Sequence, residues 1–249
     1  MMVLSCADVP AQEVPNILRI HLSNASVQEF AIASVDSITF PDSMTIHLSS
    51  GNIRRFDVET VDSVVFTVAT NIEQYEAVDL GLSVKWAVCN VGAIRPEDAG
   101  EFFAWGEIIP KKDYSEAAYT YYGNTGYEYI GVNICGTKYD VARQAWGGDW
   151  RLPTRSEIRE LTTRCTWTAE TRNDINGYRV TGINGNSIFL PAAGYKDGEE
   201  HKEIGTGGFY WSGSLNRSMT SSAYNLNFRG YDAEWTASRF YGFSVRAVR

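Results

Sequence analysis

The chain has 249 residues, with 22 basic and 30 acidic side chains and a formal net charge of −8. This charge argues against a nucleic-acid-binding protein, which usually carries a basic face, and no apolar run approaches the roughly 20 residues of a membrane helix. The three histidines and four scattered cysteines argue against a zinc site built from close pairs of ligands, so we expect no metal and no cofactor. The 7 Trp, 14 Tyr, 11 Phe and 22 Gly residues favour a β-rich chain with an aromatic core or binding face.

Residues 1–15 are interpreted as a leader and tether. Residues 3–6 (VLSC) resemble the end of a bacterial lipoprotein signal, although the basic and apolar parts of such a signal are missing. In this interpretation Cys6 is a lipid anchor, and the protein lies on the cell surface or in the periplasm with no other membrane contact. In the alternative interpretation the segment is an ordinary N-terminus whose cysteine occurs by chance.

A duplicated unit follows, with copies at residues 16–40 and 42–66. The copies align without a gap, and nine of the 25 aligned pairs are identical, which indicates a true internal repeat. Neither copy is long enough to bury a core alone, so we expect one small β module over residues 16–68. It resembles repeats that precede surface domains in Bacteroidetes-type proteins, which implies a spacer. The paired His21 and His47 are expected to face solvent rather than to bind a metal.

Both copies predict the same series of elements. An alternating strand is followed by a polar turn and a second strand, at 27–32 in one copy and 53–58 in the other. A single helical turn is expected to begin at Ser34 or Thr60, and a short apolar strand ends each copy.

A polar linker at residues 69–77 leads to the second predicted domain, residues 78–249. This domain begins with a strand–turn–strand pattern over residues 78–87. A first helix is expected at 140–146 with Asp140 as its N-cap. A second begins at Thr154, where Thr154 and Glu157 have the spacing of a capping box.

From residue 177 onward the pattern is that of β-strands. Asn184-Gly185 predicts a hairpin turn between strands at 178–181 and 187–191. Further strands are expected at 209–212, 223–229 and 242–248. The predicted order is therefore a strand pair, two helices and several antiparallel strands.

Six ordered motifs in residues 78–249 carry a family resemblance: VDLGLSVKWAVCNVGA, FFAWGE, GTKYDVARQAWGGDWRLPT, NSIFLPAAGY, GFYWSGS and YGFSVRAVR. This region resembles a C-type-lectin-like domain. The bacterial group most similar to it includes the Fibrobacter major paralogous domain and the variable proteins of diversity-generating retroelements. The resemblance implies an α+β fold with two helices and small antiparallel sheets, in which the N- and C-terminal strands lie side by side.

The alternation in residues 223–229 predicts two different faces. Tyr224, Leu226 and Phe228 share the face that packs, whereas Asn225, Asn227 and Arg229 share the face that presents hydrogen-bond donors. The resemblance implies that diversified, ligand-facing positions lie at 214–241. The alternative is a surface of loops that is merely aromatic and polar.

The candidate ligand-binding residues combine aromatic anchors with small polar groups, a mixture that suits an adaptable binding face. They are Asn216, Arg217, Asn225, Asn227, Arg229, Tyr231, Trp235, Ser238, Phe240 and Tyr241. The resemblance also implies a fixed scaffold made of Trp211, Ser212, Gly242, Phe243, Val245 and Arg246.

Enzyme functions find little support. The formylglycine-generating enzymes share the broad fold, but they need a cysteine pair near the C-terminus, and all four cysteines precede residue 166. Cys89 and Cys165 are compatible with a disulfide in an exported protein and equally with two thiols. His201 is alone in a charged loop, residues 196–203, that is expected to be a solvated turn. We therefore assign no catalytic residue.

These observations predict a surface-exposed, adhesin- or receptor-like protein. It recognises an unknown protein or glycan through residues 214–241 without a metal, and it has no nucleic-acid partner. Two alternatives remain: a structural pilus or envelope subunit, which would self-associate, and an enzyme of the formylglycine-generating fold group.

Overall fold

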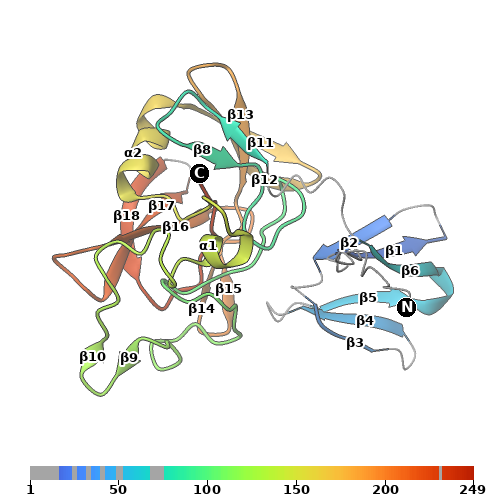
Figure 1. Cartoon of the computed structure of the whole chain (residues 1–249). Helices are drawn as coiled ribbons and strands as arrows, with labels where there is room; N and C mark the ends of the chain where they lie inside the picture. Colours follow the sequence, from blue (N-terminus) through green and yellow to red (C-terminus); the bar gives the residue numbers. More distant parts are fainter. Residues whose placement is uncertain are drawn as a thin grey trace, which may run out of the picture.

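The computed structural model describes residues 17–23, 27–31, 35–39, 43–48, 53–67, 76–229 and 232–249 (Figure 1). Over these residues the chain forms eighteen β-strands and only two α-helices. The composition correctly indicated a β-rich chain, but the predicted α+β fold of the C-type-lectin type is wrong. The prediction fails because the two helices, with six and ten residues, are too short to form a layer against the sheets.

The duplicated N-terminal region forms two three-stranded antiparallel sheets with the strand orders β2-β1-β6 and β3-β4-β5. The strands are β1 (Ile17–Leu22), β2 (Val27–Ala31), β3 (Val35–Thr39), β4 (Ser43–Leu48), β5 (Ile53–Asp57) and β6 (Val61–Thr67). Each copy contributes its hairpin to one sheet and its third strand to the other. The two copies are therefore interlocked rather than stacked.

Equivalent positions of the two copies build the core of this region. Leu18 and Ile20 of β1 are buried together with Met44 and Ile46 of β4, which occupy the same places in the second copy. Alternate residues of each central strand thus point inward.

The helical turn predicted from Thr60 is wrong. A 3-10 turn covers Val58–Thr60, and Val61 already begins β6, because its β-branched run pairs with β1. The turn predicted from Ser34 is also wrong: Ser34 itself lies outside the described residues, but Val35–Thr39 form β3, which pairs with β4. The side chain of His21 lies outside the described residues.

Residues 76–249 contain the remaining sheets, all antiparallel. Their elements are β7 (Ala77–Asp79), β8 (Lys85–Ala87), β9 (Tyr122–Gly123), β10 (Gly126–Tyr127), α1 (Val141–Trp146), α2 (Arg155–Arg164), β11 (Thr166–Arg172), β12 (Ile175–Thr181), β13 (Ser187–Pro191), β14 (Tyr195–Asp197), β15 (Glu200–Lys202), β16 (Gly208–Leu215), β17 (Ser222–Phe228) and β18 (Asp232–Ser238). The strands pair as β7-β8, β10-β9, β11-β12-β13, β14-β15 and β16-β17-β18. The predicted strand pair at 78–87 and the hairpin around Gly185 are confirmed.

Local capping signals explain where the two helices begin and end. Asp140 caps α1 by accepting hydrogen bonds from the backbone N–H groups of Ala142 and Arg143 at 3.0 and 3.2 Å. Thr154 and Glu157 form the predicted capping box of α2. Gly147, with a φ of 68°, ends α1 after six residues. Both predicted N-caps are confirmed, but each helix stays short.

The C-terminal segment passes through the centre of this region as an extended chain. Residues 242–248 were predicted to be a strand, which is wrong: they make only isolated bridges to several different segments, including those of Phe103 and Trp86. The two ends of the region lie side by side, because the backbones of Lys85 and Arg249 exchange hydrogen bonds of 2.9 and 3.0 Å. Phe243 and Val245 are buried, so this segment belongs to the core.

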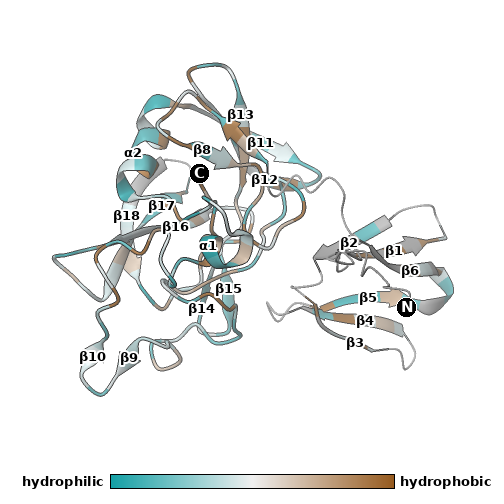
Figure 2. Ribbon diagram, in the orientation of Figure 1, coloured by the Kyte–Doolittle hydropathy of each residue, from teal (hydrophilic) through white to brown (hydrophobic). Residues whose placement is uncertain are grey.

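Hydropathy follows the packing of these elements (Figure 2). In α2, Ile158 and Leu161 are buried, whereas most of its other residues are polar. No helix in the described part of the chain is both long and apolar enough to cross a membrane.

Candidate ligand-binding site

The sheet of β16, β17 and β18 separates a packed face from an open one. On the packed face, Leu226 and Phe228 are buried in one cluster with Ile158 and Leu161 of α2, which lies against this sheet in Figure 1. Tyr224 on the same face stacks with Arg155, whose guanidinium carbon is 3.9 Å from the ring centroid. The alternation read from the sequence is thereby confirmed for this face.

The opposite face borders a cavity of about 390 Å³, which we call the sheet cavity. Its lining comes from several strands and from the C-terminal segment: Tyr195, Phe209, Met219, Ser222, Asn225, Asn227, Arg229, Trp235, Thr236, Ala237, Ser238, Tyr241 and Phe243. Six of the candidate residues line it, namely Asn225, Asn227, Arg229, Trp235, Ser238 and Tyr241. A cavity of this size matches the usual range for small-ligand sites.

Aromatic rings in mutual contact form one wall of the sheet cavity. The centroids of Tyr195 and Phe209 are 4.7 Å apart, and those of Tyr195 and Tyr241 are 5.6 Å apart. Phe243, which also lines the cavity, stacks on Trp211 with their ring centroids 4.3 Å apart. Burial, and secondarily the charge of Asp197, raises the pKa of Tyr241, so its hydroxyl stays protonated and able to donate at neutral pH.

Sequence reasoning did not find Tyr195, Phe209 and Met219. Phe209 reaches the cavity because it lies directly opposite Asn227 in the β16–β17 register, and Tyr195 comes from β14. A cross-strand pairing of residues 208–211 with 225–228 is the signal that identifies Phe209.

Asn225 differs from its prediction. It was expected to present donors on an open face, but its side chain is only 1% exposed, because it lies between Trp211 and Trp235 across the central strand. Neither its amide nitrogen nor its amide oxygen has a hydrogen-bond partner among the described residues. Each such orphaned group costs about 1–3 kcal/mol.

Trp235 and Arg229 border the sheet cavity on its accessible side. Trp235 is 58% exposed, and no ring contact to it is formed by the described residues. Arg229 pairs with Glu203 and lies 5.2 Å over the ring of Phe209. None of the described lining residues is acidic, so the cavity carries a single cation that is already neutralised.

Arg229 also borders a second cavity of about 450 Å³, which includes Tyr178 and Glu170. Glu203, its ion-pair partner, has a φ of 58°, a left-handed conformation that is uncommon for a residue with a side chain. The two cavities therefore share Arg229 in their linings.

The other candidate residues do not line the sheet cavity. Asn216 accepts a hydrogen bond from the backbone N–H of Ser218 at 3.0 Å in a turn, and Arg217 is exposed. Phe240 is half-buried, packs against the buried aromatic cluster of Phe102 and does not line the sheet cavity, so its role as an aromatic anchor stays a prediction. Tyr231 and Cys6 lie outside the described residues.

Buried hydrogen bonds fix the residues that the resemblance assigned to the scaffold. The indole of Trp211 donates to the Phe103 carbonyl at 2.8 Å, and the hydroxyl of Ser212 donates to the Tyr224 carbonyl at 2.8 Å. Arg246 donates to Asn90 Oδ1 at 2.8 Å. Gly242, Phe243 and Val245 are also buried.

A second buried arginine anchors the far end of β18. Arg239 is 1% exposed, and its guanidinium lies 4.9 Å from the ring of Trp105 and 5.2 Å from that of Tyr119. It donates to the Tyr119 hydroxyl and the Glu128 carbonyl, each at 2.9 Å. The cavity-lining strand β18 is thereby tied to the segment before β9 and to the segment after β10.

Residues 196–203 are not the solvated turn that was predicted. They form most of the β14–β15 hairpin, Lys196 is buried, and His201 Nε2 is 2.7 Å from the Ala193 carbonyl oxygen. Burial lowers the pKa of both side chains, and burial raises the pKa of the nearby Glu101 to about 7.

The three described cysteines, Cys89, Cys135 and Cys165, form no disulfide with one another, so the bond considered for Cys89 and Cys165 is not formed. Burial raises the pKa of Cys135 to about 12 and that of Cys165 to about 11, which disfavours a reactive thiolate. In the described segments, no three His, Cys, Asp or Glu side chains are placed to hold a metal ion.

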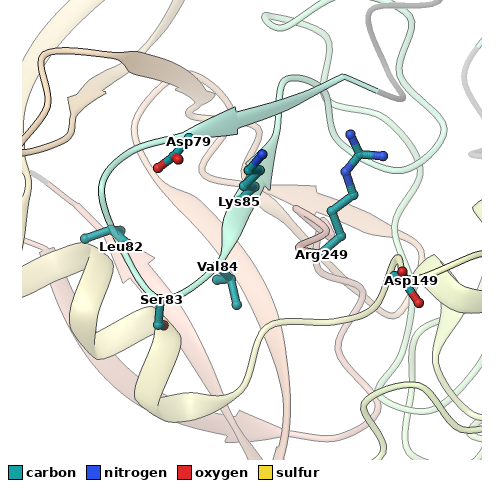
Figure 3. A pocket seen from close by; sticks show the side chains of 7 residues that line it. All are labelled: Asp79, Leu82, Ser83, Val84, Lys85, Asp149 and Arg249. Carbon is teal, nitrogen blue, oxygen red and sulfur yellow. The ribbon is translucent and has the colours of Figure 1, made fainter.

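A further cavity of about 490 Å³ lies beside the C-terminal residue (Figure 3). Figure 3 shows Lys85 and Arg249 with Asp79 and Asp149 around it. Its basic and acidic side chains balance, and the described lining includes no aromatic residue. The sheet cavity, with its aromatic wall and orphaned amide, is therefore the stronger candidate site.

Comparisons of the chain with protein-family models, with curated proteins and with solved structures found no match. The resemblance to the bacterial C-type-lectin-like group therefore stays a prediction from sequence motifs.

Proposed function

We propose that this chain is a surface-displayed, adhesin- or receptor-like protein that binds a ligand in the sheet cavity. One observation carries the proposal: six residues chosen from sequence as ligand-binding line a single cavity, with an aromatic wall beside them. Rigid aromatic side chains supply contact area at little entropic cost, and amide and hydroxyl groups give direction. Such a mixture suits recognition rather than catalysis.

The resemblance to retroelement variable proteins also enters the proposal. Ten of the thirteen lining residues fall within residues 214–241, so sequence changes confined to that segment would alter the ligand while the buried scaffold stays constant. A reverse-transcriptase gene near a second copy of this coding stretch, mismatched at adenines, is the expected genomic observation. An isolated gene with no such copy would contradict this part of the proposal.

A labelled full-length chain tests the proposal on arrays of proteins and glycans. We expect a defined set of bound ligands, and loss of binding in the double variant Asn227→Ala/Tyr241→Ala. Tyr129→Ala is the matched control, because Tyr129 is 69% exposed and lies outside the cavity lining. Binding that survives the double variant while the fold is intact would refute the assignment of this site.

The alternative of an envelope or pilus subunit is favoured by one observation. Ile109, Tyr129, Met219 and Trp235 are large apolar side chains that are each more than half exposed, and such side chains are common in subunit interfaces. Size-exclusion chromatography over a range of concentrations separates the two functions, because a packing subunit self-associates and a receptor of this kind stays monomeric.

A further inference from the structure

The unpaired side chain of Asn225 indicates which chemical group a ligand of the sheet cavity contains. Among the described residues it is the one side chain whose two polar atoms are both buried without a partner. Asn90, a buried asparagine of the same region, is satisfied by comparison, because it accepts from Arg246 and donates to the Ala99 carbonyl. The buried indole N–H of Trp86 also lacks a partner among the described residues, but Trp86 does not line the sheet cavity. Buried polar groups in native proteins usually have hydrogen-bond partners, so this exception indicates that the partner comes from another molecule.

The position of Asn225 makes a ligand the natural source of that partner. Its side chain shares a sheet face with that of Asn227, because the two are separated by one residue in β17, and both line the sheet cavity. Trp235 lies directly opposite Asn225 on β18. Its indole is 58% exposed and makes no ring contact with the described residues, so a ligand that displaced this indole would reach the amide of Asn225.

We propose that the sheet cavity takes the primary carboxamide of a glutamine or asparagine side chain presented by a protein partner, and that Asn225 pairs with it. This inference rests on the proposed function of the cavity. The side-chain amide of Asn225 offers one N–H donor and one carbonyl acceptor on the same edge. A second primary carboxamide offers the complementary edge, so both orphaned atoms gain a hydrogen bond at once.

Other groups match this edge less well. A carboxylate has no donor for the Asn225 oxygen, and a guanidinium or ammonium has no acceptor for its nitrogen. A peptide-backbone amide directs its N–H and C=O to opposite sides, so it satisfies one atom only. The neutralised charge of Arg229 and the absence of acidic residues in the described lining also favour an uncharged ligand group.

The rim of the cavity favours a protein as the source of this group. Met219 and Trp235 border it and are 57% and 58% exposed, and both residue types are enriched in protein–protein interfaces. The neighbouring hydroxyl groups of Ser222, Thr236 and Ser238 are suited to the backbone amides on either side of an inserted side chain. Two adjacent hydroxyl groups of a sugar could also donate to and accept from Asn225, so glycans are the competing class of ligand.

Selection from a random, disulfide-constrained peptide library on the full-length chain tests the inference. We expect the enriched peptides to share a Gln or Asn at one position and to lose binding to the Tyr241→Ala variant. Replacing that Gln by the similarly shaped Met is expected to weaken binding to the wild type at least about tenfold. Replacing Asn225 by Leu should remove this preference, so that the variant binds the Met peptide at least as well as the Gln peptide.

Each other result overturns a specific statement. Cavity-dependent peptides without a shared Gln or Asn, or an unchanged Gln preference in Asn225→Leu, refute the carboxamide inference and leave the proposed function standing. Binding of neutral glycans that is abolished by Asn225→Leu and by periodate treatment refutes it in favour of sugar hydroxyls. If no peptide or glycan depends on Tyr241, the proposed function itself fails.

Discussion

Replacing Asn225 by Leu is expected to stabilise the protein. The substitution keeps the branched shape of the side chain and removes two buried polar atoms that have no partner among the described residues. At about 1–3 kcal/mol for each orphaned group, the two together destabilise the fold by about 2–6 kcal/mol. Imperfect packing of the new methyl groups costs up to about 1.5 kcal/mol. We therefore expect a net gain of about 2 kcal/mol, or about 4–8 °C in melting temperature for a domain of this size.

Urea unfolding followed by tryptophan fluorescence measures this change in the relevant part of the chain, because all 7 Trp residues lie between Trp86 and Trp235. Asn227→Leu is the matched control. Asn227 lines the same cavity but is only partly buried, so its substitution should change the free energy of unfolding by less than about 0.5 kcal/mol. A clear destabilisation by Asn225→Leu would show that the amide is already paired in the free protein and would remove the basis of the carboxamide inference.

Three further predictions concern the frame around the cavity. Arg239→Ala should destabilise the fold by about 3 kcal/mol or more, because it leaves two carbonyl groups and the Tyr119 hydroxyl without their buried donor; an effect as small as that of the exposed Arg217→Ala in urea unfolding would contradict this role. Thr154→Ala should lower the free energy of unfolding by about 1 kcal/mol through loss of the α2 N-cap, whereas Thr154→Ser should retain most of that energy. Equal unfolding midpoints for the two variants would exclude the cap as the cause. Burial raises the pKa of Glu101 from its ordinary 4.5 to about 7, so the folded state binds this proton more tightly than the unfolded state. The contribution of Glu101 to stability is therefore lost as the pH rises from about 4.5 through about 7. The Glu101→Gln variant should lack this loss, and parallel curves of stability against pH for variant and wild type would refute the prediction.

Local sequence signals predicted the local structure well. The N-caps Asp140 and Thr154, the hairpin turn at Gly185 and the packed face of β17 all depend on neighbouring residues in the chain, and all are confirmed. Features set by contacts distant in sequence were missed. The wall residue Phe209 is brought to the cavity by strand register, and the burial of Asn225 depends on Trp211 and Trp235 on either side of it.

The prediction of the fold class was wrong for a related reason. The first helix ends at its predicted residue, Trp146, and α2 ends at Arg164. Helices of six and ten residues are too short to form a layer against the sheets, so correct helix boundaries did not make the predicted α+β fold correct. The family resemblance gave the helices more weight than the aromatic and glycine content of the chain supported.

The pairing of β1 with β6 determines how the duplicated region responds to a pulling force. Ile17 lies directly opposite Thr67 in this antiparallel pair, so the chain enters and leaves the duplicated region at neighbouring points. Tension applied through these two points opens the hydrogen bonds one after another, as in a zipper, instead of loading them all together. Once opened, the 51 residues from Ile17 to Thr67 extend to about 180 Å at full stretch. Under a pulling force the duplicated region therefore lengthens by unfolding and does not act as a rigid stem.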